Sequence, residues 1–202
     1  MIQERDHLLE KVTLTGKRVK LVPLEQGHVQ GLFDAGNDPQ IWTYLPNKMN
    51  TLEHMNELVL EALEAQENGL QVPFTIMDVQ TNDIMGSTRF LNISLPNKNL
   101  EIGWTWYSPK VWRTHVNTEC KYLLLRYGFE ELGLIRIQFR ADVRNVRSNT
   151  AILRIGAKHE GTLRKDRVLY SGFIRDTQQY SILDEEWPEV KVRLETQLLR
   201  VY

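Results

Sequence analysis

The sequence has only one cysteine, Cys120, among its 202 residues. One thiol cannot form an intramolecular disulfide bond, and it cannot supply the group of thiolates that holds a structural zinc ion. His7, His28 and His54 stand alone, without the spacing of metal ligands, so we expect them at the surface or as helix caps. The composition therefore favours a reducing compartment, the cytosol, and predicts no bound metal.

The chain also lacks an excess of charge and a long apolar run. Its formal net charge is −1 at pH 7, so no bulk attraction to nucleic acid is expected. No apolar run approaches the roughly 18 residues that span a bilayer, and the first residues are polar and acidic. We expect neither a nucleic-acid partner nor a membrane anchor. A hydrophobic content of 42% over this length predicts a single domain covering residues 1–202.

Hydrophobic periodicity predicts about seven strands. They span Val19 to Leu24, Val72 to Val79, Ile84 to Ser94, Leu100 to Tyr107, Leu134 to Asp142, Lys158 to Val168 and Phe173 to Leu183. The second, third and fourth are joined by short turn sequences, which predicts an antiparallel meander. In the fifth, Ile135, Ile137, Phe139 and Ala141 alternate with polar residues, so one face is expected to be buried.

Helices are expected between these strands. One or two follow the first strand and carry His28, Leu32 and Trp42, with a loop from Trp42 to Pro46. Others are predicted after an N-cap at Thr51, from about Thr114 to Leu132, from Asn145 to Ile155, and from Trp187-Pro188 to the end. Gly133 and Gly156 stand where helices end, Gly156 in a left-handed conformation. This order indicates an α+β fold with one central, mostly antiparallel sheet.

The segment Trp112-Arg-Thr-His-Val-Asn-Thr-Glu119 lies between a strand and a long helix. A helix start has unpaired backbone N–H groups and a partial positive charge, which suit a bound anion. A second helix opens at Asn145-Val-Arg-Ser148 and is followed by Gly156 to Gly161. Together these three segments resemble the Gcn5-related N-acetyltransferases (GNAT), and in particular the branch that acetylates the N-termini of ribosomal proteins.

The resemblance covers roughly Thr13 to Trp187, and residues 188–202 form the C-terminal helix. It implies a GNAT fold with a twisted, mixed, mostly antiparallel sheet flanked by helices. Two central strands, here Leu100 to Tyr107 and Leu134 to Asp142, are expected to splay apart and to hold acetyl-CoA in the wedge between them. The expected activity is acetyl transfer to a primary amine by direct attack in a ternary complex. A homodimer is an expectation of the resemblance only.

The same resemblance implies which residues hold the cosubstrate. They are Trp112, Arg113, Thr114, His115, Val116, Asn117 and Thr118 in the loop, with Asn145 and Ser148 in the second helix. The chain departs from the family pattern, because His115 and Asn117 stand where small residues are common. Glycine there lets backbone approach a ligand closely, so His115 must turn its ring away from the phosphates or bond to them. A plain helix cap made by Thr114, with no anion bound, is the alternative.

Three residues are candidates for the chemistry. Transfer requires a proton to leave the amine and the released sulfur to be stabilised. By the same resemblance, Ser148 matches a serine that lies close to the departing sulfur in the ribosomal-protein branch. Ile152 stands where many members of the family have a tyrosine that acts as the acid. Glu160 and Glu101 are alternative general bases, and bulk water is a third possibility. For both glutamates an ordinary surface ion pair is the competing interpretation.

Aromatic residues complete the expected site. Trp42, Trp104 and Trp106 could line an acceptor pocket, although core packing is the commoner role for such residues. Strand alternation puts Trp104 and Trp106 on one face. The acceptor is either a protein α-amino group or a small amine. The alternative function is a catalytically weakened domain of the same fold that senses acyl-CoA or binds a protein partner.

Overall fold

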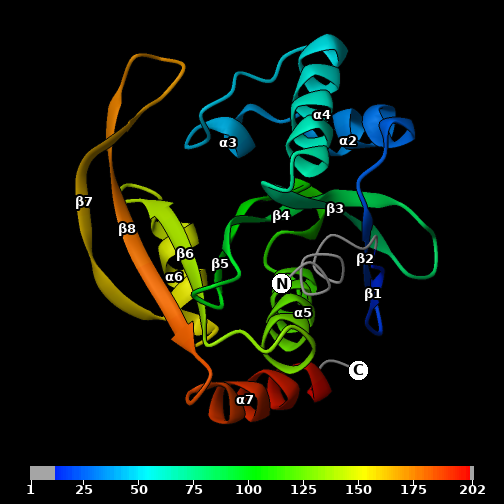
Figure 1. The fold of residues 1–202 in the computed structure, drawn as a ribbon. Coiled ribbons are helices and arrows are strands. Elements are labelled where there is room, and N and C mark those ends of the chain that lie inside the picture. The colour runs from blue at the N-terminus through cyan, green and yellow to red at the C-terminus, as the bar shows by residue number, and fades with distance from the viewer. Residues whose placement is uncertain (1–11, 201–202) are drawn as a thin grey trace.

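A computed structural model describes residues 12–200. The elements are β1 (Leu14–Thr15), β2 (Val19–Pro23), a 3-10 turn (Gln26–His28), α2 (Val29–Gly36), α3 (Pro39–Trp42), α4 (Leu52–Glu67), β3 (Gln71–Asp78), β4 (Ile84–Ser94), β5 (Asn99–Tyr107), a 3-10 turn (Pro109–Val111), α5 (Val116–Arg126), a π-helical turn (Tyr127–Glu131), β6 (Arg136–Asp142), α6 (Val146–Arg154), β7 (Lys158–Val168), β8 (Ile174–Leu183) and α7 (Trp187–Leu199). Figure 1 shows the sheet with helices on both sides.

Within residues 12–200 the strands form one sheet of eight, in the order β1-β2-β3-β4-β5-β6-β8-β7. Of these described strands only β5 and β6 pair in parallel, and every other neighbouring pair is antiparallel. The predicted meander is confirmed as β3, β4 and β5. The count of seven missed β1, because two residues are too short to show a period.

Two apolar clusters cover the two faces of the sheet. One joins the sheet to α5, α6 and α7 and includes Phe74, Leu124 and Ile137, each fully buried. The other joins α2, α3 and α4 to Trp106. Helix α4 shows how the sequence produces this packing, because Met55, Leu58, Val59 and Ala62 repeat at helical spacing and are all buried. The Thr51 hydroxyl caps α4 by accepting from the His54 N–H at 3.3 Å, as predicted.

Three details differ from the sequence predictions. Helix α5 begins at Val116 rather than Thr114, and the chain passes into a π-helical turn after Arg126. Ile135 precedes β6 and is 48% exposed, so its assignment to the buried face is wrong. The alternation of β6 begins only at Arg136, and before it Leu134, at 3% exposed, takes the buried position instead. Trp42 lies at the end of α3 rather than in a loop.

Other local predictions are confirmed. Gly133 and Gly156 have φ of 61° and 105°, as expected for residues that end helices in the left-handed region. His28 and His54 act as caps, accepting from the N–H groups of Glu25 and Asn50. His7 lies outside the described residues.

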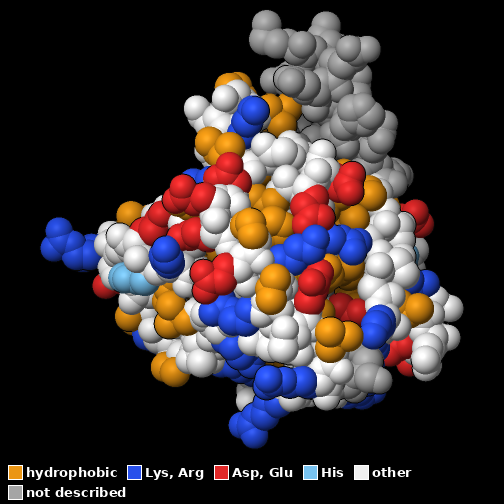
Figure 2. Space-filling view, turned by 90° about the horizontal axis from the view of Figure 1, so that it is seen from below, with side chains coloured by type: hydrophobic (Ala, Val, Ile, Leu, Met, Phe, Trp, Pro, Cys, Tyr) orange, Lys and Arg blue, Asp and Glu red, His pale blue; other side chains and the backbone are white. Residues whose placement is uncertain are grey.

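The face that carries α7 shows acidic, basic and apolar side chains together (Figure 2). Ion pairs and hydrogen bonds account for part of this mixture. Glu130 accepts from both Lys191 Nζ and Trp187 Nε1, at 2.8 and 2.9 Å. Tyr122 on α5 donates to Glu195 on α7 at 2.7 Å. These contacts dock α7 against α5 and close the apolar cluster beneath it.

The Glu119 carboxylate ties α5 to the turn between β1 and β2. It is 3% exposed. It accepts from the backbone N–H groups of Lys17 at 2.5 Å, Arg18 at 3.3 Å and Val19 at 3.2 Å. Gly16 leaves room for it, since a Cβ there would meet Glu119 Oε1 at 2.3 Å. One side chain thus fixes the start of α5 relative to the sheet.

Glu119→Ala should lower the free energy of unfolding by about 2 to 4 kcal/mol, because three buried or partly buried backbone N–H groups lose their acceptor. Urea unfolding measures this change. Glu57→Ala, at an exposed position of α4, is the control and should stay within about 0.5 kcal/mol of the wild type. Equal, small effects of both substitutions would contradict the anchoring role.

Candidate active site

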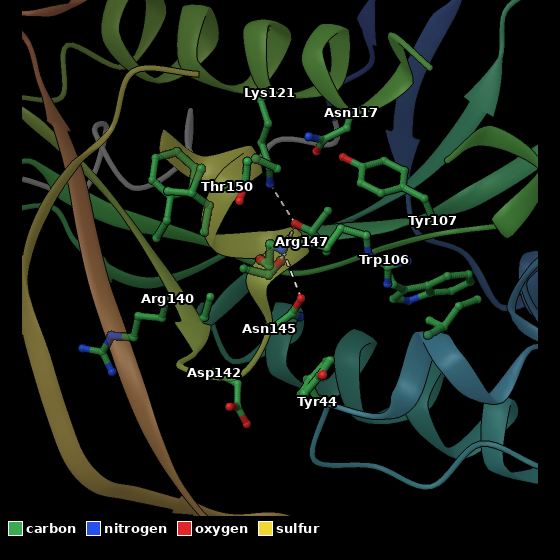
Figure 3. Close-up of a pocket in the computed structure, with 18 of the residues that line it drawn as sticks. Tyr44, Trp106, Tyr107, Asn117, Lys121, Arg140, Asp142, Asn145, Arg147 and Thr150 are labelled. Carbon is green, nitrogen blue, oxygen red and sulfur yellow. Dashed lines mark hydrogen bonds between the residues drawn. The ribbon is translucent and has the colours of Figure 1, made fainter. Parts of the chain in front are cut away.

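The strands β5 and β6 separate soon after they meet. Their parallel register covers only Asn99 to Glu101 on β5 and Arg136 to Gln138 on β6. Beyond that point each strand continues, β5 to Tyr107 and β6 to Asp142. A cavity of about 590 Å³ lies where they have parted, lined by both strands, α6 and the loop before α5 (Figure 3).

A β-bulge in β5 shapes this cavity. Between the pairs Ser87 with Trp106 and Arg89 with Gly103, two residues of β5 oppose one of β4. Trp104 has a φ of 50°, which is unusual for a large side chain. The extra residue interrupts the alternation, so Ile102 packs in the cluster under α5 while Trp106 packs in the cluster under α4. Trp104 packs against the same cluster as Trp106, which agrees with the shared environment expected for the two.

The loop before α5 forms one wall. Trp112, Arg113, Thr114 and Asn117 line the cavity. Trp112 Nε1 donates to the Tyr107 carbonyl at 2.8 Å, and the Thr114 hydroxyl accepts from the Val116 N–H at 3.3 Å. His115, Val116 and Thr118 do not line it; His115 is the residue before α5, and the other two are buried.

The start of α6 forms the opposite wall. The Asn145 side chain caps α6 by accepting from the Ser148 N–H at 3.0 Å. Asn145 and Ser148 both line the cavity. The guanidinium of Arg147 lies over the Trp112 ring, 3.8 Å from its centroid. This contact joins the two helix starts that were predicted from sequence as separate segments.

Three segments are in contact beside the lining residues Tyr44, Asp142 and Arg175. Arg144 pairs with Asp142 at 2.7 Å. Its guanidinium carbon also lies 3.6 Å from the centroid of the Phe173 ring and 5.5 Å from the centroid of the Tyr44 ring. Arg175 on β8 donates to the Tyr44 carbonyl at 3.2 Å. The loop after α3, the end of β6 and the β7–β8 hairpin therefore meet here.

The charge of the lining is strongly unequal. Its cations are Arg113, Lys121, Arg140, Arg147, Arg154 and Arg175, whereas Asp142 is the one carboxylate among the described lining residues. Burial raises the pKa of Asp142, but the hydrogen bonds and charge of Arg144 outweigh it and hold that pKa below its usual value. Such a lining suits an anionic ligand.

A family model described as an acetyltransferase (GNAT) domain matches residues 18–158. The chain belongs to the GNAT acetyltransferase family. The uncharacterized N-acetyltransferase YnaD of Bacillus subtilis (strain 168) is 25% identical to it over 174 residues, which cover 86% of this chain and 98% of that protein.

Solved structures agree with this membership. A GCN5-related N-acetyltransferase from Brucella melitensis has a TM-score of 0.86 and 28% identity, covering 93% of this chain and 85% of that chain. Mycobacterium smegmatis RimJ in complex with CoA-disulfide has a TM-score of 0.81 and 18% identity, and the match covers 94% of this chain and 96% of that chain. At 18% identity the likeness concerns the fold alone. In residues 12–200 no helix is long and apolar enough to cross a membrane, and no group of three potential metal ligands occurs.

Both glutamates considered as bases for this GNAT protein lie outside the cavity lining. Glu160 on β7 forms a two-pronged ion pair with Arg136 and accepts from the Ser181 hydroxyl at 2.8 Å. The hydrogen bonds from Arg136 lower its pKa. Glu101 is buried, accepts from Asn92 at 2.8 Å and pairs with Arg140 at 3.3 Å. Burial raises its pKa.

Trp42 is also absent from the cavity lining of this GNAT domain. Its ring packs against the ring of Trp106, with 5.3 Å between the two ring centroids, and its Nε1 donates to the Gly36 carbonyl. Trp42 therefore supports the ring of Trp106, which does line the cavity together with Trp104.

Sequence reasoning missed Lys121, Asp142, Arg147 and Tyr44. Lys121 lies four residues after Asn117, so the two share one face of α5, and helical spacing could have found it. Asp142 ends β6, the strand already assigned to the wedge. No sequence signal indicates Tyr44, because its place depends on contacts with Arg144 and Arg175 from distant segments.

Asn145→Ala should lower the free energy of unfolding by about 1 kcal/mol, because α6 loses its N-cap. Asn145→Asp keeps an oxygen acceptor at the cap and should stay close to the wild type. Urea unfolding of the two variants compares them directly. Equal loss in both would mean that the cap bond does not stabilise α6.

Proposed function

We propose that this protein is an acetyl-CoA-dependent N-acetyltransferase that acetylates a primary amine by direct attack in a ternary complex. The supporting observation is the wedge between β5 and β6, which brings two helix starts and an excess of cations to one cavity. The acceptor is a protein α-amino group or a small amine. A cytosolic location and a homodimer are further proposals, which rest on the single cysteine and on the family.

The residues of the cavity fit the cosubstrate. Arg113, Thr114 and Asn117 lie at the start of α5, where free backbone N–H groups and positive charge suit a pyrophosphate. Arg147 can add a charge-assisted hydrogen bond from the opposite wall. His115 stays out of the cavity lining, so its ring does not occupy the phosphate position. Asn145 keeps an amide N–H₂ group available while its oxygen caps α6.

Acetyl-CoA would supply an acetyl group activated as a thioester. Beyond Glu101 the β5 backbone has no pairing with β6, so its edge is free to bond an extended ligand. Ser148 presents a hydroxyl from α6, which we propose as a hydrogen-bond donor to the departing sulfur. Trp104, Trp106 and Tyr44 line the end that would receive the amine. Since Glu101 and Glu160 are held in ion pairs outside the lining, water is proposed to take the proton of the amine.

Acetyl-CoA should raise the melting temperature of the protein in a saturable way, because it binds only the folded state. Arg147→Ala should weaken binding by about tenfold, equivalent to about 1.4 kcal/mol, through loss of one charge-assisted contact. A thermal-shift titration measures both. Arg164→Ala, at an exposed position of β7, should bind like the wild type. The absence of any shift for the wild type at millimolar ligand would overturn the proposed function.

Ser148→Ala should lower kcat by about tenfold with little change in affinity for acetyl-CoA, because the hydroxyl acts on the departing group. Glu160→Gln should change stability rather than kcat, since Glu160 pairs with Arg136 away from the cavity. Steady-state assays on an accepted amine compare the two variants. A large loss of kcat in Glu160→Gln with normal stability would restore that glutamate as the base.

A further inference from the structure

Lys121 is a buried cation inside the cavity. It projects from α5 toward the space between β5 and β6 (Figure 3). It is 6% exposed. Its Nζ donates to the Thr105 hydroxyl at 2.8 Å and lies 5.7 Å from the centroid of the Phe139 ring. The two strands of the wedge thus hold the ammonium group between them.

Within residues 12–200 the ammonium group of Lys121 has no carboxylate partner. Among the ion pairs of the described residues, none involves Lys121. Cys120 is its titratable neighbour on the same helix. The titratable and charged groups that line the same cavity are Tyr107 on β5, Arg140 and Asp142 on β6, Arg147 and Arg154 on α6, Arg175 on β8, Tyr44 after α3 and Arg113 before α5. Burial lowers the pKa of Lys121 to about 8, although the neighbouring Cys120 opposes this. A buried, uncompensated ammonium disfavours folding. An anion bound in the cavity would compensate it.

Lys121 lies in the part of the wedge where the two strands have parted. Thr105 follows the bulge residue Trp104, at the point where β5 has left β6. Ile152 faces the same cavity from α6 and offers no proton. The Ser148 hydroxyl can donate a hydrogen bond but carries no positive charge. Lys121 therefore combines a positive charge with a proton that it can release, whereas the arginines of the lining keep theirs.

We propose that the Lys121 ammonium group binds the sulfur released during acetyl transfer and protonates it. This inference rests on the proposed function and assigns a residue to its leaving-group step. The lone pair of the acceptor nitrogen forms the bond to the acetyl carbon, and the bond from that carbon to sulfur breaks with its electron pair going to sulfur. Sulfur takes a proton from Lys121. The acceptor nitrogen loses a proton to water, and Lys121 regains one from water.

The first test is the thiol pKa of bound CoA, followed through the ultraviolet absorbance of its thiolate. In the wild type this pKa should lie about 1 to 3 units below that of free CoA, because a cation lies next to the sulfur. In Lys121→Met it should return to the value of free CoA. Lys110→Met, at an exposed position before α5, should behave like the wild type. This readout needs no acceptor and no turnover.

The second test is the rate of transfer. Lys121→Met should lower kcat by about 100-fold with its affinity for acetyl-CoA changed by less than threefold. The wild-type kcat should fall above about pH 8, where Lys121 loses its proton. In Lys121→Arg this alkaline decline should disappear and kcat should be low at all pH, because an arginine keeps its proton.

Unfolding provides the structural control. The pKa of Lys121 in the folded state, about 8, is below its usual 10.5, so its cost to folding is complete below pH 8 and disappears as pH rises through 10.5. Lys121→Met should therefore be at least as stable as the wild type at pH 7. Lower activity in that variant cannot then be attributed to unfolding.

The outcomes separate the two proposals. If the wild type neither binds acetyl-CoA nor acetylates any amine, the proposed function fails and this inference fails with it. If the wild type transfers acetyl groups and Lys121→Met matches it in kcat, the inference alone is overturned. A lower kcat with an unchanged thiol pKa for bound CoA would also overturn it, since Lys121 would then be a positioning residue.

Discussion

The separation of β5 and β6 is the constraint on which the rest of this structure depends. The eight strands of the sheet could pair without interruption, but the parallel register of β5 with β6 ends after three residues, which leaves the facing edges of these two strands unpaired with each other. Unpaired backbone groups are costly to bury, so this gap must open to solvent or to a ligand. The cavity, the approach of α5 from one side and the approach of α6 from the other all follow from it.

Side chains rather than backbone connect the two strands beyond their last pair. Glu101 on β5 reaches Arg140 on β6 at one face of the sheet. At the other face Lys121 contacts Thr105 on β5 and the Phe139 ring on β6. Glu119, two residues before Lys121, holds the same helix to the turn before β2. The helix that lines the wedge is therefore fixed at its first turn, which positions its charged residues with little freedom.

Much of the architecture could be predicted because its signals are local. The period of two in β6 and the helical period in α4 each follow from a short run of residues, and Asn145 and Gly156 mark the ends of α6 in the expected way. The predictions failed where a local pattern was extended too far. Ile135 continued the alternation of β6 in the sequence, but it precedes that strand and its side chain is exposed, while Leu134 is buried. The bulge at Trp104 leaves no sequence signal, because it depends on the register with β4.

The residues of the site likewise divide into those that the sequence could place and those that only the structure placed. Residues at the two helix starts could be placed in it from sequence, because a helix start binds anions for reasons that belong to the helix itself. Glu160 was proposed from its place in a motif, yet the registers of β7 and of β6 against β8 put it beside Arg136, the first residue of β6. Arg144 meets Phe173 and Tyr44 from segments that are far apart in the chain.

The sequence alone thus determined most of the strands and helices and their order, because periodicity and capping act over a few residues, and its motifs indicated the family through their resemblance to known members. Only the tertiary structure decided which polar groups face one another across the wedge, because strand register, the bulge and the separation of β5 from β6 are set by contacts between distant segments.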